Sequence, residues 1–415
     1  MSTFAPDLRL AAVPRIDSQV GFRLCAMTCL AAVFLQKLAL PGTAGLLALN
    51  LFVFLAAALA AFLLAAVEIN RPAFLWYAAF ATAGALSLAM SRSPRVSALS
   101  LGLLLLVQLP LVFRVTSSLR PERLWRLVST LGCVFAAVGV IQFAAQFVVG
   151  PRLAFPLDTA LPDWLALKGF NSMIPLYWSS AIFKSNGVFF LEPSFFCQFL
   201  AVAVVAELLL AGRLLRLLLL MAGLISSYSG TGLTMLALFL PIYAVRHGRI
   251  QLAIAAALAC LFLVFFGDAL SIDAFVSRLG EFTDNQSSGW ARFFSMFDVL
   301  QDVLFAKDLT LFTGQGPGTV QQSFERVSYL AFDPTWGKLL YEYGLVGTFA
   351  YLAFFYTAFC NGARGLRFAV GYTYFLLGGY LINASILMLA ASLVVWLGQP
   401  ISADHPNAGT VRTNP

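Results

Sequence analysis

Long apolar segments follow one another along almost the whole chain, and they constrain the fold more than any other feature. A helix crosses a bilayer with about 20 apolar residues, and the sequence holds about twelve such segments by this criterion. Hydrophobic residues make up 60% of the chain and charged residues 11%, whereas soluble domains are about 25% charged. We therefore predict an all-α integral membrane protein whose spans lie near 22–40, 44–67, 72–90, 96–114, 126–149, 195–212, 215–228, 231–246, 250–267, 345–362, 367–381 and 383–398.

Two pairs of these segments are ambiguous in their organisation. Residues 215–246 and 367–398 are each compatible with one long kinked helix or with two short helices. The breaks would fall at "SSYSGTG" and "GGYLINAS", which are rich in glycine, serine and asparagine.

Arginine residues occupy alternate connections between the apolar segments. Because cytoplasmic loops carry an excess of Lys and Arg, this alternation predicts that both termini lie in the cytoplasm. The first 20 residues lack the apolar core of a signal peptide, so the first span is expected to act as the targeting signal. Arg92 and Arg95 interrupt the alternation. Either the rule is violated there, or this pair has a function on the outer face.

Two connections are too long to be turns, namely residues 150–194 and 268–344. By the predicted topology both are periplasmic, and they hold most of the 19 carboxylates. Loops of this length in compact proteins are usually functional. Within the second loop, 290–305 has apolar residues at helical spacing and predicts an amphipathic helix along the outer membrane surface. The chain is thus expected to form one polytopic domain, 1–415, with a polar cytoplasmic tail at 399–415.

Several other classes of site are disfavoured by the sequence. The six cysteines fall in or beside apolar segments and lack the partners of a zinc site. The net charge of +7 comes from residues scattered at span ends, so positive-inside topology explains it better than a nucleic-acid partner. Carboxylate clusters that would bind a divalent metal are absent from the sequence pattern, and we expect neither metal nor cofactor.

Four stretches form an ordered set, namely "KSNGVFFLEPSFF" (184–196), "SSYSGTG" (226–232), "RLGEFTDNQSSGWARF" (278–293) and "GQGPGTVQQSF…DPTWGKLLYEYGLVG" (314–347). In order and placement they resemble the O-antigen polymerase and ligase family of bacterial inner-membrane enzymes. The resemblance covers roughly residues 70–400. It departs from the family at Lys184, where arginine is usual, and at Ser229–Gly232, where many members carry arginine. The histidine that many members place after the Gly-x-Gly turn is also missing here, which weakens the ligase interpretation more than the polymerase one.

The resemblance implies polymerisation of undecaprenyl-pyrophosphate-linked oligosaccharides into exopolysaccharide, capsule or O-antigen on the periplasmic face. It also implies flippase and chain-length-regulator proteins as membrane partners. Cations aimed at the leaving pyrophosphate would stabilise the charge that develops there, and a carboxylate would act as general base.

The candidate residues for these tasks fall into three groups. The candidate bases are Glu192 and Asp333, with Glu192 favoured because it shares the mouth of a span with Lys184, and Arg292 is expected to be catalytic as well. The expected pyrophosphate ligands are Lys184, Arg278, Arg292, Arg92 and Arg95. Glu342 is a third candidate base and also a glycan-contact candidate, together with the aromatic residues Trp178, Trp290 and Trp336. These aromatic side chains are alternatively interfacial anchors.

Simpler interpretations of the same residues stay open. Lys184 would snorkel to the interface in a purely structural role, and Glu192 would interact with the dipole of the helix that follows. A ligase that transfers finished polymer to an acceptor lipid is the alternative within the enzyme class. A flippase or transporter is the alternative outside it, although transporters place polar groups on broken helices at the midplane, whereas the polar residues here concentrate in two outer loops.

Overall fold

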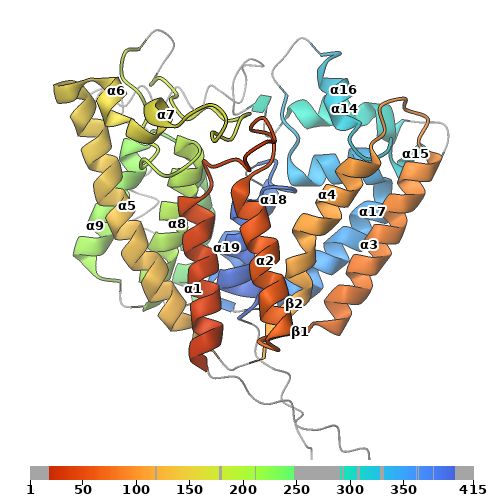
Figure 1. The fold of residues 1–415 in the computed structure, drawn as a ribbon, viewed down its shortest axis with the longest axis horizontal. Coiled ribbons are helices and arrows are strands. Elements are labelled where there is room, and N and C mark those ends of the chain that lie inside the picture. Colours follow the sequence, from red (N-terminus) through yellow and green to blue (C-terminus); the bar gives the residue numbers. More distant parts are fainter. Residues whose placement is uncertain are drawn as a thin grey trace, which may run out of the picture.

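The chain folds into a bundle of helices whose sides are apolar (Figure 1). The computed structural model describes residues 18–116, 119–176, 180–210, 212–246, 290–291, 294–305, 309–327, 331–360, 362, 364–376 and 378–397. The predicted span at 250–267, Arg278, Arg292, Trp178 and the tail at 399–415 lie outside these residues.

Within the part of the chain that the structure describes, four helices are long and apolar enough to cross a membrane, and shorter apolar helices pack among them. The four are α3 (Arg71–Met90), α5 (Pro121–Val149), α8 (Pro193–Leu210) and α17 (Thr335–Cys360). Many large apolar side chains on the outer helix surfaces are exposed, including Leu75, Ile141 and Val148, as expected where lipid is the solvent. The prediction of a helical membrane protein is confirmed, while the count of twelve spans stays a prediction.

The shorter elements complete the bundle. The apolar ones are α1 (Ser18–Phe34), α2 (Leu49–Leu63), α4 (Ala98–Gln108) with the 3₁₀ turn η1 (Leu109–Val112), α9 (Leu214–Ser226), α10 (Gly230–Arg246), α18 (Arg364–Leu376) and α19 (Ala384–Ala390) with the π-helical turn η2 (Ala391–Val395). Among the described residues, the helices of the two long connections are α6 (Pro151–Ala154), α7 (Pro156–Ala160), α14 (Ser295–Leu304), α15 (Thr310–Thr313) and α16 (Val320–Phe324).

Local sequence signals mark where several helices begin and end. Prolines occupy the first turn of α3, α5 and α8, a position where the missing N–H has no helical partner anyway. Gly150 ends α5 with a φ of +80°, a conformation that glycine adopts without strain. The structure resolves the two ambiguous pairs of segments, because α9 and α10 are separate helices, and so are α18 and α19.

The bundle has two distinct ends. A two-stranded antiparallel ribbon, β1 (Val67–Ile69) with β2 (Phe113–Val115), lies at the end where α1 begins; we call this the ribbon end. Helices α6, α7, α14, α15 and α16 lie at the opposite end, which we call the loop end (Figure 1). Both long connections therefore reach the same end of the molecule, as their predicted placement on one side of the membrane requires.

Arginines gather at the ribbon end. Arg114 of β2 pairs with Glu68 of β1 at 2.6 Å, and Arg71 begins α3 directly after β1. The starts of α5 and α18 lie side by side. Gly365 of α18 lies so close to the ring of Trp125 of α5 that a Cβ added at Gly365 would collide with it. Arg123 and Arg364 lie in these first turns. These arginines of alternate connections thus lie at the same end of the bundle.

Two groups of helices make up the core. Helix α8 is buried along most of its length and packs against α5, α9, α10 and α18. Helix α17 packs mainly against α3, and its first turns also contact α14, α15 and α16. The two groups meet through α18 and the turn η2. Consequently the starts of α8 and α17, which carry the predicted site residues, lie in one structure rather than in separate domains.

Helix α14 confirms that part of the second loop is an amphipathic helix, although its partner differs from the expected one. Met296, Val299, Leu300 and Val303 are buried in a small cluster with α16 and the start of α17. Asp298 is exposed on the other face. The apolar face therefore packs on protein, whereas a helix along a membrane surface would turn it toward lipid.

Candidate functional site

The stretch between Lys184 and α8 is anchored by a buried glutamine of α5. The Oε1 atom of Gln142 accepts hydrogen bonds from Ser185 Oγ at 2.7 Å and from the Asn186 N–H at 3.1 Å. Its Nε2 donates to Asn186 Oδ1 at 2.9 Å. One turn later, Gln146 accepts from the N–H of Phe183 at 2.8 Å. This part of the first loop is therefore fixed to α5 by side chains that point out of a membrane span.

A buried ion pair reinforces the same segment from another direction. Lys37, in the turn after α1, donates to Asp158 at 2.6 Å, and both side chains are buried. The second carboxylate oxygen of Asp158 accepts from Asn186 Nδ2 at 2.9 Å. The ion pair thus ties the α1–α2 connection to the first loop.

Lys184 and Glu192 flank this anchored segment in the sequence. Lys184 is buried, and its N–H donates to Ile174 O at 2.9 Å. Glu192 directly precedes Pro193, and its carboxylate accepts from Ser194 Oγ at 3.0 Å and from the Asn171 N–H at 3.3 Å. Glu192 thus lies at the positive end of the α8 dipole, which attracts a carboxylate.

The serine-rich break between α9 and α10 adjoins the same segment. The carbonyl oxygen of Ser226 accepts from the N–H of Ser185 at 3.1 Å. Thr231 Oγ1 donates to the carbonyl oxygen of Ser194 at 3.3 Å. Two of the four stretches that carry the resemblance are therefore in direct contact.

Helix α17 is interrupted at Gly344, where φ is +62°. This break frees carbonyl groups that would otherwise bond within the helix, and the glycine-rich turn of the second loop uses them. The Gln315 N–H donates to Tyr341 O at 2.8 Å, and the Gly316 N–H donates to Glu342 O at 3.0 Å. The turn is therefore attached to α17 by main-chain hydrogen bonds.

The "MSRSPRVS" segment after α3 lies against this turn. Ser91 Oγ donates to Gln315 O at 2.5 Å, and the Ser97 N–H donates to Pro317 O at 2.9 Å. Arg95 forms an exposed ion pair with Glu325 at 2.7 Å, and Arg92 is exposed. The two arginines that broke the charge alternation are therefore at the loop end, beside the second loop.

A chain of three charged groups occupies the start of α17. Lys338 Nζ lies 3.1 Å from Glu342 Oε1 and 3.3 Å from Asp333 Oδ2. Glu342 is fully buried, and its Oε1 also accepts from the Val320 N–H at 3.3 Å. Asp333 is the most accessible of the three, with 27% of its side chain exposed. In this structure Asp333 is open to solvent, whereas Glu342 is enclosed by protein.

The segment at 378–380 contacts the beginnings of both α8 and α17. Gly378 O accepts from the Thr335 N–H at 3.3 Å. The hydroxyl of Tyr380 bonds to the amide of Gln198 at 2.8 Å, and its ring lies against Phe195. A single short segment therefore connects the helix that follows Glu192 with the helix that follows Asp333.

The predicted aromatic residues have different surroundings. Trp336 is half-buried, and its ring centre lies 5.3 Å from that of Phe297 on α14. Trp290 is also half-buried, next to the start of the second-loop helices. The structure thus gives Trp336 a packing partner within the protein.

The sequence interpretation missed three residues of this site, namely Gln142, Asn186 and Lys338. A signal for Gln142 was present, because Gln142 and Gln146 are spaced four apart in an otherwise apolar span and so share one face. Lys338 and Glu342 have the same spacing within "KLLYE". Neither four-residue spacing indicates which part of the protein these polar side chains contact.

Buried polar groups also occur inside the helices. Gln108 donates to Tyr374 Oη at 2.7 Å, and Asn50 donates to Ser385 at 2.5 Å. Together with the break in α17, they show that the placement of polar residues does not separate an enzyme from a transporter. Among the residues that the structure describes, no group of three His, Cys, Asp or Glu side chains is arranged to hold a metal ion.

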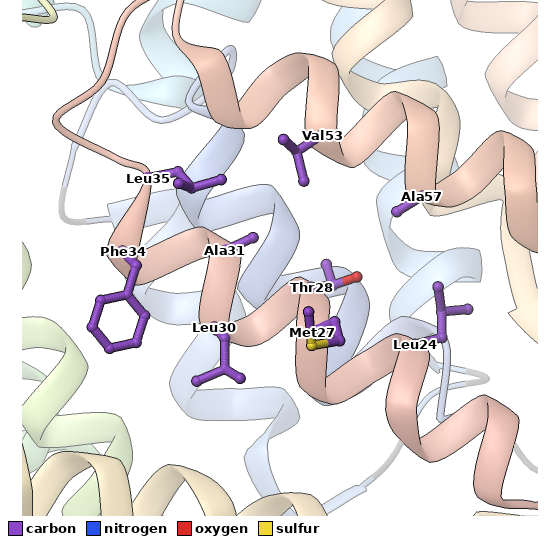
Figure 2. Close-up of a pocket in the computed structure, with 9 residues that line it drawn as sticks. All are labelled: Leu24, Met27, Thr28, Leu30, Ala31, Phe34, Leu35, Val53 and Ala57. Carbon is purple, nitrogen blue, oxygen red and sulfur yellow. The ribbon is translucent and has the colours of Figure 1, made fainter.

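An apolar groove runs between α1 and α2 (Figure 2). Its volume is about 300 Å³, and among the residues that line it Thr28 has the one polar side chain. Phe34 lines the groove, and its ring lies 4.9 Å from that of Phe189, which belongs to the segment between Lys184 and Glu192. The groove therefore adjoins the anchored segment of the first loop.

Comparison with models of known protein families finds no match, and comparison with functionally curated proteins finds none. The family resemblance consequently rests on the four stretches and their order.

Proposed function

We propose that this protein polymerises oligosaccharides linked to a polyprenyl pyrophosphate and works at the loop end of the bundle. One observation carries the proposal. An acidic residue followed by proline stands at the start of each of α8 and α17, as Glu192–Pro193 and Asp333–Pro334, and the segment 378–380 connects the two helix starts. A lysine lies near each acid in sequence, Lys184 and Lys338. Carboxylates and cations at one membrane face are the groups that glycosyl transfer from a pyrophosphate requires.

The reaction assigned to this site has one bond-forming and one bond-breaking event. A hydroxyl oxygen of the acceptor sugar attacks the anomeric carbon of the donor and gives its proton to Glu192 or Asp333. The bond between the anomeric carbon and the pyrophosphate oxygen breaks, and its electron pair leaves with the pyrophosphate. Lys184, Arg278 and Arg292 are the proposed cations that stabilise this charge, with Arg92 and Arg95 as additional ones.

The groove between α1 and α2 supports a lipid-linked substrate. Its lining is apolar, as a polyprenyl chain requires, and its end at Phe34 adjoins the segment between Lys184 and Glu192. A chain lying there would place its head group near the proposed cations.

Deleting the gene in its host and analysing lipid-linked and surface glycans by gel tests the proposal. Accumulation of single repeat units is the expected result. Full-length polymer retained on the lipid pyrophosphate would instead indicate a ligase, and loss of every periplasmic intermediate would indicate a flippase.

A reconstituted assay tests the roles of the acids. Purified protein in liposomes should elongate a synthetic polyprenyl-pyrophosphate oligosaccharide, with or without a chelator of divalent metals. Glu192→Gln and Asp333→Asn keep side-chain size but remove the charge, and at least one should be inactive. Asp163→Asn, at an exposed carboxylate of the first loop, is the matched control. Wild-type rates in both site variants would rule out a general base at either position.

A further inference from the structure

Asp333, Lys338 and Glu342 form a line from the surface into the protein at the start of α17. Lys338 Nζ is within 3.3 Å of Asp333 and within 3.1 Å of Glu342. The side chain of Asp333 is 27% exposed, that of Lys338 is 10% exposed and that of Glu342 is fully buried. Of these three groups, Asp333 is therefore the one that can meet a substrate, and the other two act through it.

The line contains one positive charge, on Lys338, and two carboxylates, and this ratio affects how strong a base Asp333 can be. A lysine paired with one carboxylate would neutralise it and make it a weak base. Here Lys338 is shared between two carboxylates, so Asp333 keeps net negative charge while Lys338 still fixes its direction. Glu342 is suited to be the inner partner, because its Oε1 is held by Lys338 and by the Val320 N–H.

Retaining such a group only for stability is physically unfavourable. Replacing a buried ion pair with neutral side chains of similar size is often neutral or stabilising, whereas removing one partner is strongly destabilising. A lysine between two acids, placed beside an accessible carboxylate at the loop end, therefore calls for a role in addition to packing.

We propose that Lys338 is a positioning residue for Asp333 and that Glu342 is the buried counterion that holds Lys338 in place. This inference rests on the proposed glycosyl transfer and makes Asp333 the acceptor of the hydroxyl proton. Glu192, held by Ser194 and the Asn171 N–H, then has a positioning role, since these two bonds connect the start of α8 with the first loop.

The test uses the full-length protein in liposomes with the synthetic polyprenyl-pyrophosphate oligosaccharide. The double variant Lys338→Met/Glu342→Gln removes both inner charges together, so its melting temperature should stay close to that of the wild type. Its kcat should fall by about 10²-fold, the scale of a lost catalytic proton-transfer contribution, while KM changes little. The control Arg216→Met/Glu207→Gln removes an ion pair at the ribbon end, where Glu207 is buried, and should keep the wild-type kcat.

A third variant distinguishes a Lys338 that acts through Asp333 from a Lys338 that acts on the reaction independently. If Lys338 acts through Asp333, adding Asp333→Asn to the double variant should leave a rate no lower than that of Asp333→Asn alone. Multiplying losses would overturn the inference, as would a double variant with wild-type kcat. In both cases an active wild type would leave the proposed function standing. A wild-type protein that elongates nothing would overturn the proposed function and this inference together.

Discussion

Lys37 Nζ and Asp158 Oδ1 lie 2.6 Å apart in a buried ion pair, although 121 positions separate them in the sequence. Asp158→Asn leaves a buried lysine without a counterion and should destabilise the protein by about 3–5 kcal/mol. The melting temperature in detergent measures this loss. Adding Lys37→Met should restore most of it, because the amide oxygen introduced by Asp158→Asn can still accept from Asn186.

The exposed pair of Arg95 and Glu325 provides the control for that experiment. Glu325→Gln should change stability by less than about 1 kcal/mol, since exposed ion pairs contribute little. Equal losses from the buried and the exposed pair would show that the Lys37–Asp158 contact contributes no more to stability than a surface ion pair.

Gly344→Ala should detach the glycine-rich turn from α17. At a φ of +62° and a ψ of −166°, a region that essentially only glycine adopts, an alanine costs about 1–3 kcal/mol from its backbone alone. Its Cβ would also lie 2.5 Å from the carbonyl group of Phe312. We expect a lower melting temperature and faster proteolysis of the second loop. Gly371→Ala in α18, where a Cβ meets nothing within 4 Å, should be neutral or stabilising.

Lys184→Arg should keep activity, because either cation can bind a pyrophosphate and arginine is usual at this position in the family that the sequence resembles. Lys184→Met should reduce the elongation rate by about 10²-fold, the scale of one lost charge contact at a transition state. The reconstituted assay measures both variants. Full activity of Lys184→Met would show that the charge of Lys184 is not needed for elongation.

Single cysteines should report the orientation of the two ends of the bundle. Asp163→Cys and Gln321→Cys lie on exposed residues of the two long connections, and Arg126→Cys lies on an exposed residue at the start of α5. An impermeant maleimide applied to intact spheroplasts should label the first two above the background of the parent protein. Arg126→Cys should react only after permeabilisation. The reverse labelling pattern would show that the ribbon end, and not the loop end, faces the outside.

Filling the groove between α1 and α2 should weaken the binding of a lipid-linked donor. Ala57 lines the groove, and Ala57→Phe would displace part of a bound hydrocarbon chain. Each CH₂ group excluded from an apolar contact costs about 0.8 kcal/mol, so losing two raises KM about tenfold. Ala60→Phe, at an exposed position of α2 outside the groove lining, should leave KM unchanged.

Much of the helical framework was predictable because lipid-facing helices require unbroken apolar segments. The exact starts were less predictable. The predicted span start at 345 coincides with the second part of α17, which follows the break at Gly344, whereas the first part, from Thr335, was not predicted. Lys338 and Glu342 pair with each other in this first part, inside the protein. Hydropathy alone treats these two charges as loop residues. A four-residue spacing of opposite charges was the available signal.

The candidate site was predictable as a set of stretches and not as a set of contacts. Sequence order placed Lys184 and Glu192 at the mouth of a span and Asp333 in the second long loop. The contacts that hold these stretches come from distant positions: Gln142 binds Asn186, and Lys37 binds Asp158. Such pairings depend on how the helices are arranged around one another, and no periodicity in one segment encodes that arrangement.

The break at Gly344 has a consequence for how this protein can diversify. The second loop is attached there through the N–H groups of Gln315 and Gly316 and the carbonyl groups of Tyr341 and Glu342. Every residue type except proline supplies such an N–H group. The side chain at position 315 can therefore change without releasing the loop, so the surface of the second loop is free to evolve while its anchor stays constant.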